Sequence, residues 1–249
     1  MNAIKLNEKN KAQVQTFLKQ YGNSALQRAI SQYREANPLS TGTMPVIDLQ
    51  PALDGKNQYQ KDWINFYNKQ EGKAKNKRMI LASDVYRAGN SKSKELLASL
   101  RKDFDDSVVV SGTRNLYNKD NLAGKIVHNF NSTIAKPIEL AVAEIPVYKS
   151  ENVKNVVEGK GLAYAQALFQ TKDKSAKIID TLETLSQKGA EDIRFWTPDQ
   201  SSRKNNSERA VWFDCGDDGF RVDGDDWGWD DVYSGRSRGV LLDSAKRSR

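Results

Sequence analysis

The sequence predicts an α+β protein in which helices and strands are concentrated in different parts of the chain. Apolar residues recur at helical spacing in residues 8–36 and 160–189, whereas short runs after residue 192 alternate apolar and polar side chains. The length of 249 residues and the hydrophobic content of 38% allow a substantial core. The chain is therefore expected to form one large domain, or a medium-sized domain with an extension.

Residues 1–75 are expected to form an N-terminal helical extension and a linker. Helices are predicted within residues 8–36. Residues 38–55 hold three of the six prolines, which indicates either a linker or an ordered arm that crosses the fold. A short helix is predicted at 61–70, and the basic segment at 72–78 is the expected domain boundary.

Residues 76–249 are expected to form the main domain. Its first predicted elements are a buried strand at 78–86, a helix that Ser91 caps, strands at 107–118 and 125–130 around a turn at Lys119 and Asp120, and an extended segment at 138–148. The later predicted elements are a helix at 160–170, a helix capped by Ser175 and ended by Gly189, and short strands at 193–198, 208–215, 220–223 and 238–243.

Enzyme chemistry is not predicted. Cys215 is the only cysteine and His128 the only histidine, which excludes intrachain disulfides, cysteine-based zinc sites and sites that need several histidines. No phosphate-binding glycine loop occurs, and an EF-hand loop started at Asp223 would place Trp227 and Ser234 at calcium-ligand positions. We therefore expect no catalytic residue, no metal and no cofactor, and we interpret His128 and Cys215 as structural.

Membrane insertion is not predicted either. No run approaches the roughly 18 apolar residues of a membrane helix, and the first residues lack the apolar core of a secretory signal. Synthesis in the cytosol is therefore expected. The sequence does not predict the oligomeric state.

Charge is divided unevenly along the chain. The net charge is +7, yet residues 212–235, here called the acidic stretch, carry eight aspartates and one cation, Arg221, which leaves about +14 on the remainder. Such a basic remainder permits contacts with nucleic-acid phosphates. Nucleic-acid binding by the basic N-terminal half is therefore the alternative function, with the acidic stretch as an autoinhibitory mimic of phosphate.

The acidic stretch has an unusual composition for a connecting loop. Asp and Gly serve turn geometry, which is the simplest explanation, but Trp227 and Trp229 stand among them. The codons GAC for Asp and GGC for Gly each arise from the Asn codon AAC by changes at adenines only, whereas the Trp codon TGG has no adenine. The segment DDWGWDD, residues 225–231, is therefore consistent with descent from NNWNWNN by substitution at adenines alone.

This pattern resembles the variable region of proteins diversified by retroelements, in which a reverse transcriptase randomises adenines near the C-terminus. Two helices, strands that begin at IRFWTPDQSS, then RAVWF, a hairpin and a closing SRGV resemble the C-type lectin fold of archaeal and viral members. The resemblance covers residues 78–249 and is most specific over 193–242. It implies a C-type lectin-like fold, with two helices packed on a mixed, mainly antiparallel sheet, and a variable region at about 200–240.

The resemblance also implies a function, the binding of a protein or other macromolecule on a target cell surface through a diversified C-terminal surface. The implied ligand-binding positions are Asp214, Gly216, Asp217, Asp218, Arg221, Asp223, Asp225, Asp226, Gly228, Asp230, Asp231, Tyr233 and Ser234. Trp196, Trp212 and Phe213 would be scaffold, and Trp227 and Trp229 would either anchor the loop or contact the ligand. A virion is one location that the resemblance implies.

Two activities of related proteins are not implied. Sugar-binding C-type lectins hold calcium through Glu-Pro-Asn or Gln-Pro-Asp together with Trp-Asn-Asp, whereas this chain has Thr197, Pro198 and Asp199. Formylglycine-generating enzymes need a cysteine pair, and this chain has a single cysteine. Neither calcium-dependent sugar binding nor that enzyme activity is therefore expected.

Overall fold

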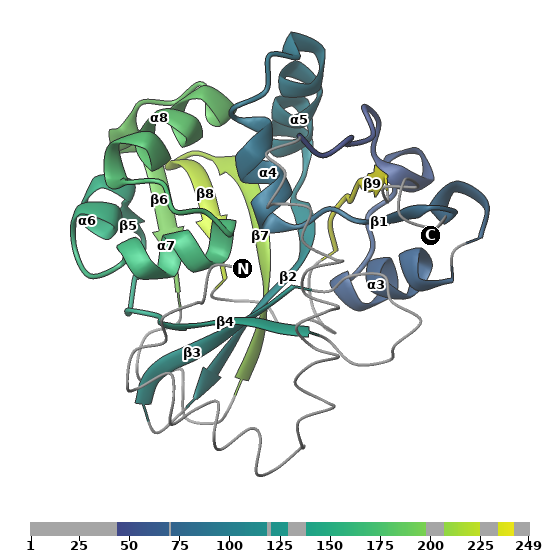
Figure 1. Cartoon of the computed structure of the whole chain (residues 1–249). Coiled ribbons are helices and arrows are strands. Elements are labelled where there is room, and N and C mark those ends of the chain that lie inside the picture. The colour runs from purple at the N-terminus through teal and green to yellow at the C-terminus, as the bar shows by residue number, and fades with distance from the viewer. Residues whose placement is uncertain are drawn as a thin grey trace, which may run out of the picture. The chain divides into compact units, whose positions relative to one another are not determined.

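The computed structural model describes residues 44–69, 71–118, 121–128, 138–197, 207–224 and 234–241 (Figure 1). The chain divides into two compact units, Met1–Thr43 and Met44–Arg249, and every described residue belongs to the second. The helices predicted within 8–36 and the turn predicted at Lys119 and Asp120 lie outside the described residues.

Residues 44–58 cross the C-terminal segment of the chain. Ile47 forms an antiparallel bridge with Val240. Gln58 and Gly235 exchange two backbone hydrogen bonds, each 3.0 Å long. Of the two alternatives predicted for the proline-rich segment, its described part is therefore an ordered arm.

Helix α3, Gln60–Asn68, confirms the short helix predicted there. Trp63 is fully buried, and its indole Nε1 donates to the carbonyl of Gly235 at 2.7 Å. Met79 and Val110 belong to the same small hydrophobic cluster, which is separate from the main core. Because these contacts join α3 to later strands, the domain boundary predicted near residue 75 lies inside the compact unit.

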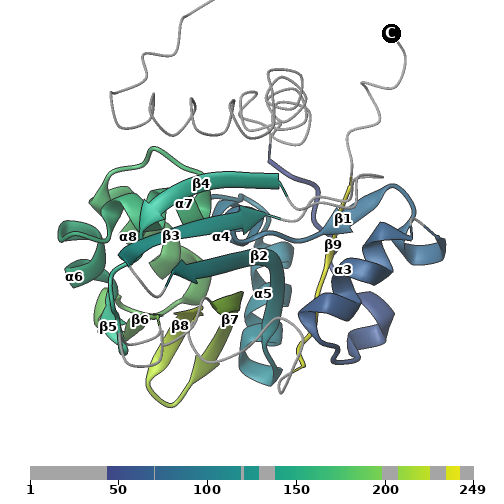
Figure 2. The ribbon, with the colours of Figure 1, turned by 90° about the horizontal axis from the view of Figure 1, so that it is seen from below.

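Strand β1, Lys77–Met79, pairs antiparallel with strand β9, Gly239–Leu241, beside α3 (Figure 2). The predicted strand over 78–86 is correct only for its first residues, since Ala82–Ala88 forms helix α4. An apolar run of this length does not by itself distinguish a strand from a buried helix.

A buried ion pair stabilises the start of α4. Arg78 donates Nη2 to Asp84 at 2.9 Å, and the Leu81 amide donates to the same carboxylate at 2.9 Å. A carboxylate near the first turn satisfies helix amides and opposes the positive end of the helix dipole. A tertiary contact therefore decides the conformation of this segment.

Helix α5, Lys94–Asp106, was predicted, but its cap is Ser93 and not Ser91. Ser93 Oγ accepts a hydrogen bond from the Leu96 amide at 3.2 Å, which is the usual N-cap arrangement. The Ser91 hydroxyl instead accepts from the amide of Ser93 at 3.1 Å.

A seven-stranded sheet in the order β4-β3-β2-β7-β8-β6-β5 forms the centre of the unit. Its strands are β2 (Val109–Asn118), β3 (Asn121–His128), β4 (Ile138–Glu144), β5 (Glu151–Asn152), β6 (Ile193–Trp196), β7 (Ser207–Gly216) and β8 (Gly219–Asp223). Among the described strands of this sheet, β6 and β8 are parallel and all other pairs are antiparallel. The strands predicted in these segments are present, and the mixed, mainly antiparallel sheet is confirmed.

Three helices follow β5 (Figure 1). They are α6 (Val153–Glu158), which was not predicted, α7 (Leu162–Phe169) and α8 (Ser175–Ser186). Lys174, not Ser175, occupies the cap of α8, because the Ser175 hydroxyl donates to the Val157 carbonyl at 2.6 Å. Gln187, with a left-handed φ of 58°, ends α8 before the predicted stop at Gly189.

Helices α4 to α8 share one hydrophobic core with the sheet. Short 3₁₀ turns complete the described elements at Ala52–Gly55, Gly72–Ala74 and Ala190–Asp192. Stacked Tyr86 and Phe169, with ring centroids 4.7 Å apart, join α4 to α7. The α+β class is confirmed, and more helices than the expected two pack on the sheet.

Candidate ligand-binding surface

The first part of the acidic stretch is a hairpin of β7 and β8 with two different faces. Val211, Phe213, Phe220 and Val222 point into the main core and are at most 2% exposed. Because side chains alternate along a strand, the residues between them lie on the opposite face, which we call the outer face. The main core covers the inner face of the hairpin, and Trp212, Asp214 and Asp223 on the outer face are buried as well.

Strand register arranges the outer face in two rows. In one row, Arg194 of β6 lies beside Arg221 of β8, and Arg221 lies beside Asp214 of β7. In the next row, Trp196, Asp223 and Trp212 lie side by side in the same strand order. The outer face thus combines guanidinium groups, carboxylates and indoles.

Arg221 and Asp214 form a two-point ion pair within the first row. Arg221 Nε donates to Asp214 Oδ1 at 2.7 Å, and Arg221 Nη2 donates to the other oxygen. Burial raises the pKa of the Asp214 carboxyl, and the hydrogen bonds from Arg221 oppose that shift. The Arg221 guanidinium carbon also lies 5.9 Å from the Trp212 ring centroid, within the range of a cation–π contact.

The tip of the hairpin is exposed and acidic. Asp217 and Asp218 form its turn, and both are exposed. Gly219 follows with a φ of 108°, and a Cβ there would lie 2.0 Å from the Asp192 carbonyl oxygen. The structure therefore requires glycine at 219, where the codon pattern alone would allow other residues, whereas Asp217 and Asp218 can change without loss of packing.

The residues on either side of the undescribed segment 225–233 are firmly held. Tyr117 donates its hydroxyl to the Gly224 carbonyl at 2.8 Å, and a Cβ at Gly224 would lie 2.4 Å from the side-chain nitrogen Nδ2 of Asn115. At the other end, a Cβ at Gly235 would lie 2.6 Å from the Val108 carbonyl oxygen. Gly224 is thus enclosed by the side chains of Asn115 and Tyr117, and Gly235 by the backbone of Val108 and the side chain of Val110.

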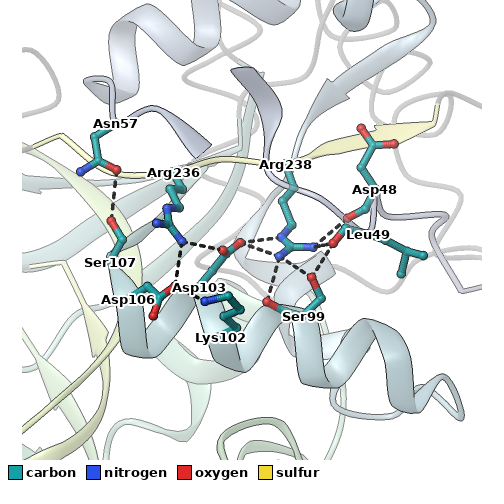
Figure 3. A network of polar contacts seen from close by, with 10 residues as sticks. All are labelled: Asp48, Leu49, Asn57, Ser99, Lys102, Asp103, Asp106, Ser107, Arg236 and Arg238. Atoms are coloured by element: carbon teal, nitrogen blue, oxygen red, sulfur yellow. Dashed lines mark hydrogen bonds and ion pairs between the residues drawn. The ribbon is translucent and has the colours of Figure 1, made fainter. Parts of the chain in front are cut away.

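A buried network of polar contacts holds the chain just after Gly235 (Figure 3). Arg238 is fully buried and donates Nε and Nη2 to Asp103 at 2.9 and 2.5 Å. Arg236 Nη1 donates to the other Asp103 oxygen at 3.1 Å. One carboxylate of α5 therefore receives two arginines that immediately follow the acidic stretch.

Arg238 also binds the ordered arm formed by residues 44–58. Its Nη1 donates to the carbonyls of Asp48 and Leu49 at 2.9 and 2.6 Å, and its Nη2 donates to the Ser99 carbonyl at 2.9 Å (Figure 3). Sequence reasoning missed this network, because nothing local to Arg238 indicates a partner 135 positions earlier.

The predicted ligand-binding residues that the structure describes differ in their exposure to solvent. Asp217 and Asp218 are exposed, Gly216, Arg221 and Ser234 are half-buried, and Asp214 and Asp223 are 7% and 3% exposed. Outside the described residues lie Asp225, Asp226, Gly228, Asp230, Asp231 and Tyr233, together with Trp227 and Trp229. Of the predicted scaffold residues, Trp212 and Phe213 are buried and Trp196 is half-buried.

His128 and Cys215 lie apart from the outer face. His128 is fully buried with Nδ1 2.9 Å from Thr113 Oγ1, and burial lowers its pKa to about 3. Cys215 is half-buried and packs against the main core, where burial raises the pKa of its thiol. Both groups are therefore neutral near pH 7.

Within the described ranges, no three His, Cys, Asp or Glu residues are grouped so that they could hold a metal ion. No helix among the same residues has the length and apolar character to cross a membrane. Comparison of the chain with known protein families, with curated protein sequences and with solved structures finds no match.

Proposed function

We propose that the protein is a ligand-binding variable protein of C-type lectin-like fold, and that the acidic stretch forms a diversified surface for a macromolecule on a target. The observation that carries the proposal is the division of the hairpin between a buried frame and an exposed acidic tip. Apolar residues of β7 and β8 fill the core and Asp214 and Asp223 are buried on the outer face, whereas Asp217 and Asp218 are exposed at the tip. Such an arrangement lets displayed residues change while the frame stays constant.

The anchors around the acidic stretch support the same proposal. Gly224 and Gly235 are closely packed, and Arg236 and Arg238 bind Asp103 just beyond. These contacts use residues outside 225–233. Changes within that segment therefore leave the anchors intact.

The pairing of β1 with β9 also supports the proposal. It brings the start of the main predicted domain next to its end, so the residues that follow the acidic stretch are paired within the compact unit. A frame closed in this way suits a display role, because binding residues are more precise when regular elements hold their ends.

Sequencing the genomic locus tests the proposed function. We expect a reverse-transcriptase gene nearby and a near-copy of the region that encodes the acidic stretch, with differences confined to adenines of the copy. The copy should have Asn codons at many of the positions that now encode Asp217, Asp218, Asp225 and Asp226. A locus without such a copy, or a copy with differences spread over all bases, would refute the proposal.

The alternative, nucleic-acid binding, has one structural observation in its favour. Exposed lysines surround α3, at positions 56, 61, 69, 73 and 75. Lys73 already pairs with Asp54 at 2.8 Å, and exposed lysines are common on soluble proteins. Binding of the full chain to duplex DNA and to RNA at about 50 mM salt tests it, and the affinity should fall steeply as salt rises.

A further inference from the structure

An open cavity of about 580 Å³ lies on helix α3, at the edge of the unit beside β1 and β9 (Figure 2). This volume is in the range of small-molecule binding sites. The described residues that line it are Gln58, Asp62, Asn65, Phe66, Asn68 and Lys69. Four of the six are exposed, and the other two, Gln58 and Phe66, are half-buried. A ligand can therefore reach the lining from solvent.

The period of α3 explains why these side chains gather. Asp62, Phe66 and Lys69 follow one another at intervals of four and three positions, which places them on one face of a helix. Trp63 and Tyr67 lie on another face and are buried. The buried face holds the helix in place and leaves the lining face to solvent.

Phe66 supplies a fixed aromatic surface to the cavity. Its ring packs edge-on against Trp63 and Tyr67, with ring centroids 5.8 and 5.0 Å away and interplanar angles of 82° and 79°. Trp63 is itself held by its hydrogen bond to the Gly235 carbonyl. The Phe66 ring is therefore positioned before a ligand arrives, which lowers the entropy cost of binding.

The polar part of the lining suits a planar ring that carries donors and acceptors on its edge. The amides of Gln58, Asn65 and Asn68 each offer a carbonyl oxygen and an NH₂ group. Asn and Gln side chains bind the edges of nucleic-acid bases, and aromatic side chains stack on the faces of unpaired bases. The lining thus combines the two kinds of contact that recognise an unpaired base.

The segment that carries the cavity is positively charged. Residues 54–77 contain six lysines and three acids, a net charge of +3. One of the acids, Asp54, pairs with Lys73 at 2.8 Å. Lys61 and Lys69 are exposed on either side of Asn65, at the two ends of the cavity's helix. A ligand with phosphates is therefore favoured over a neutral ring such as a sugar, because exposed lysines attract phosphates.

We propose that the cavity on α3 binds one base of a single-stranded nucleic acid. The base stacks on Phe66, and the amides of Asn65 and Asn68 bind its edge. Lys61 and Lys69 contact the phosphates on either side of that base. A single strand is the ligand because a base within a duplex exposes neither its face nor its pairing edge. The inference does not rest on the proposed function, since no described lining residue belongs to the acidic stretch.

A matched pair of labelled DNA strands tests the site on the full-length protein. The probes are a thymidine decamer and an abasic decamer, which carry the same phosphates and differ only in the bases, and a duplex of the thymidine decamer with its complement is a third probe. Fluorescence anisotropy at about 50 mM salt measures the affinities. We expect the thymidine decamer to bind more tightly than the abasic decamer by about fivefold to a hundredfold, as for the stacking of one base.

Substitutions in the lining then connect this difference to the cavity. Phe66→Leu should weaken binding of the thymidine decamer by a similar factor and leave the abasic decamer and the duplex unchanged, because it removes only the stacking surface. Asn65→Ala changes an exposed position, so it should fold even if Phe66→Leu does not. It should weaken binding of the thymidine decamer about twofold to tenfold, as for one lost hydrogen bond, and leave the abasic decamer unchanged.

A lysine substitution separates contacts with phosphates from contacts with the base. Lys69→Gln should weaken both decamers and reduce the slope of log affinity against log salt by about 0.7, the value for one phosphate contact on a single strand. Lys154→Gln is the matched control, because Lys154 is exposed on α6, on the opposite side of the unit from α3 (Figures 1 and 2). That change should alter the affinities less than about twofold and leave the slope unchanged.

Several outcomes would overturn the site. They are equal affinities for the thymidine and abasic decamers, no binding of either, unchanged binding of the thymidine decamer in both Phe66→Leu and Asn65→Ala, and equal salt slopes in Lys69→Gln and Lys154→Gln. None of them depends on the genomic locus. A locus with a reverse transcriptase and a near-copy, combined with any of these outcomes, would leave the proposed function standing and remove only the site on α3.

Discussion

Replacing Arg238 by methionine should destabilise the protein strongly. Arg238 is fully buried, and Asp103, its partner, has a side chain only 4% exposed. Methionine fills a similar volume but leaves the Asp103 carboxylate with Arg236 alone, at 3.1 Å, and leaves the carbonyls of Asp48 and Leu49 without this donor. Removal of one member of a buried ion pair usually costs about 3–5 kcal/mol. We expect the lower half of that range, because Arg236 remains.

Urea unfolding followed by tryptophan fluorescence measures this loss. The m-value should stay constant while the midpoint falls, because the unfolded surface does not change. Lys102→Met is the matched control, since the same substitution on α5 removes a 72% exposed lysine paired with Asp106. That change should cost no more than about 0.5 kcal/mol.

A double-mutant cycle with Asp103→Asn separates the ion pair from simple packing. If the pair accounts for the loss, Arg238→Met should cost much less in the Asp103→Asn protein than in the wild type. Additive costs, or an Arg238→Met cost of less than about 1 kcal/mol, would show that the pair does not hold the end of the acidic stretch to α5.

Three further predictions concern the hairpin, the buried histidine and the cysteine. Trp212→Ala should lower the free energy of unfolding by about 3–5 kcal/mol. The double variant Asp217→Asn/Asp218→Asn should have a stability within about 0.5 kcal/mol of the wild type. Thermal melts measure both, and equal losses would contradict a displayed tip. Burial lowers the pKa of His128 from 6.5 to about 3, so between these pH values the unfolded chain binds more protons than the folded protein. The free energy of unfolding should therefore fall as the pH decreases from 6.5 to about 3, by up to about 1.4 kcal/mol per pH unit. His128→Gln should lack this component, and identical pH profiles of the two proteins would refute it. Iodoacetamide should modify Cys215 far more slowly in the native protein than in urea at pH 7, because burial raises the thiol pKa, and equal rates would show an accessible thiolate.

The sequence by itself determined the parts of the fold that have a local cause. Alternation of apolar and polar residues predicted the strands at 193–198 and 208–215. The structure has both strands, and Ile193, Phe195, Val211 and Phe213 lie in the core. The apolar spacing of Leu162–Phe169 likewise predicted a helix. Such patterns are readable because the period of a strand or helix depends only on neighbouring residues.

Only the tertiary structure decided the features whose cause is distant in the chain. Apolar composition favoured a strand over residues 78–86, but Asp84 pairs with Arg78 and Ala82–Ala88 forms a helix. The composition of the acidic stretch did not distinguish Asp214 and Asp223, which are buried, from exposed Asp217. The burial of these carboxylates depends on what the neighbouring strands place beside them, which is Arg221 for Asp214 and the two indoles of Trp196 and Trp212 for Asp223. No local period encodes that placement, so the sequence could locate the candidate surface but not its contacts.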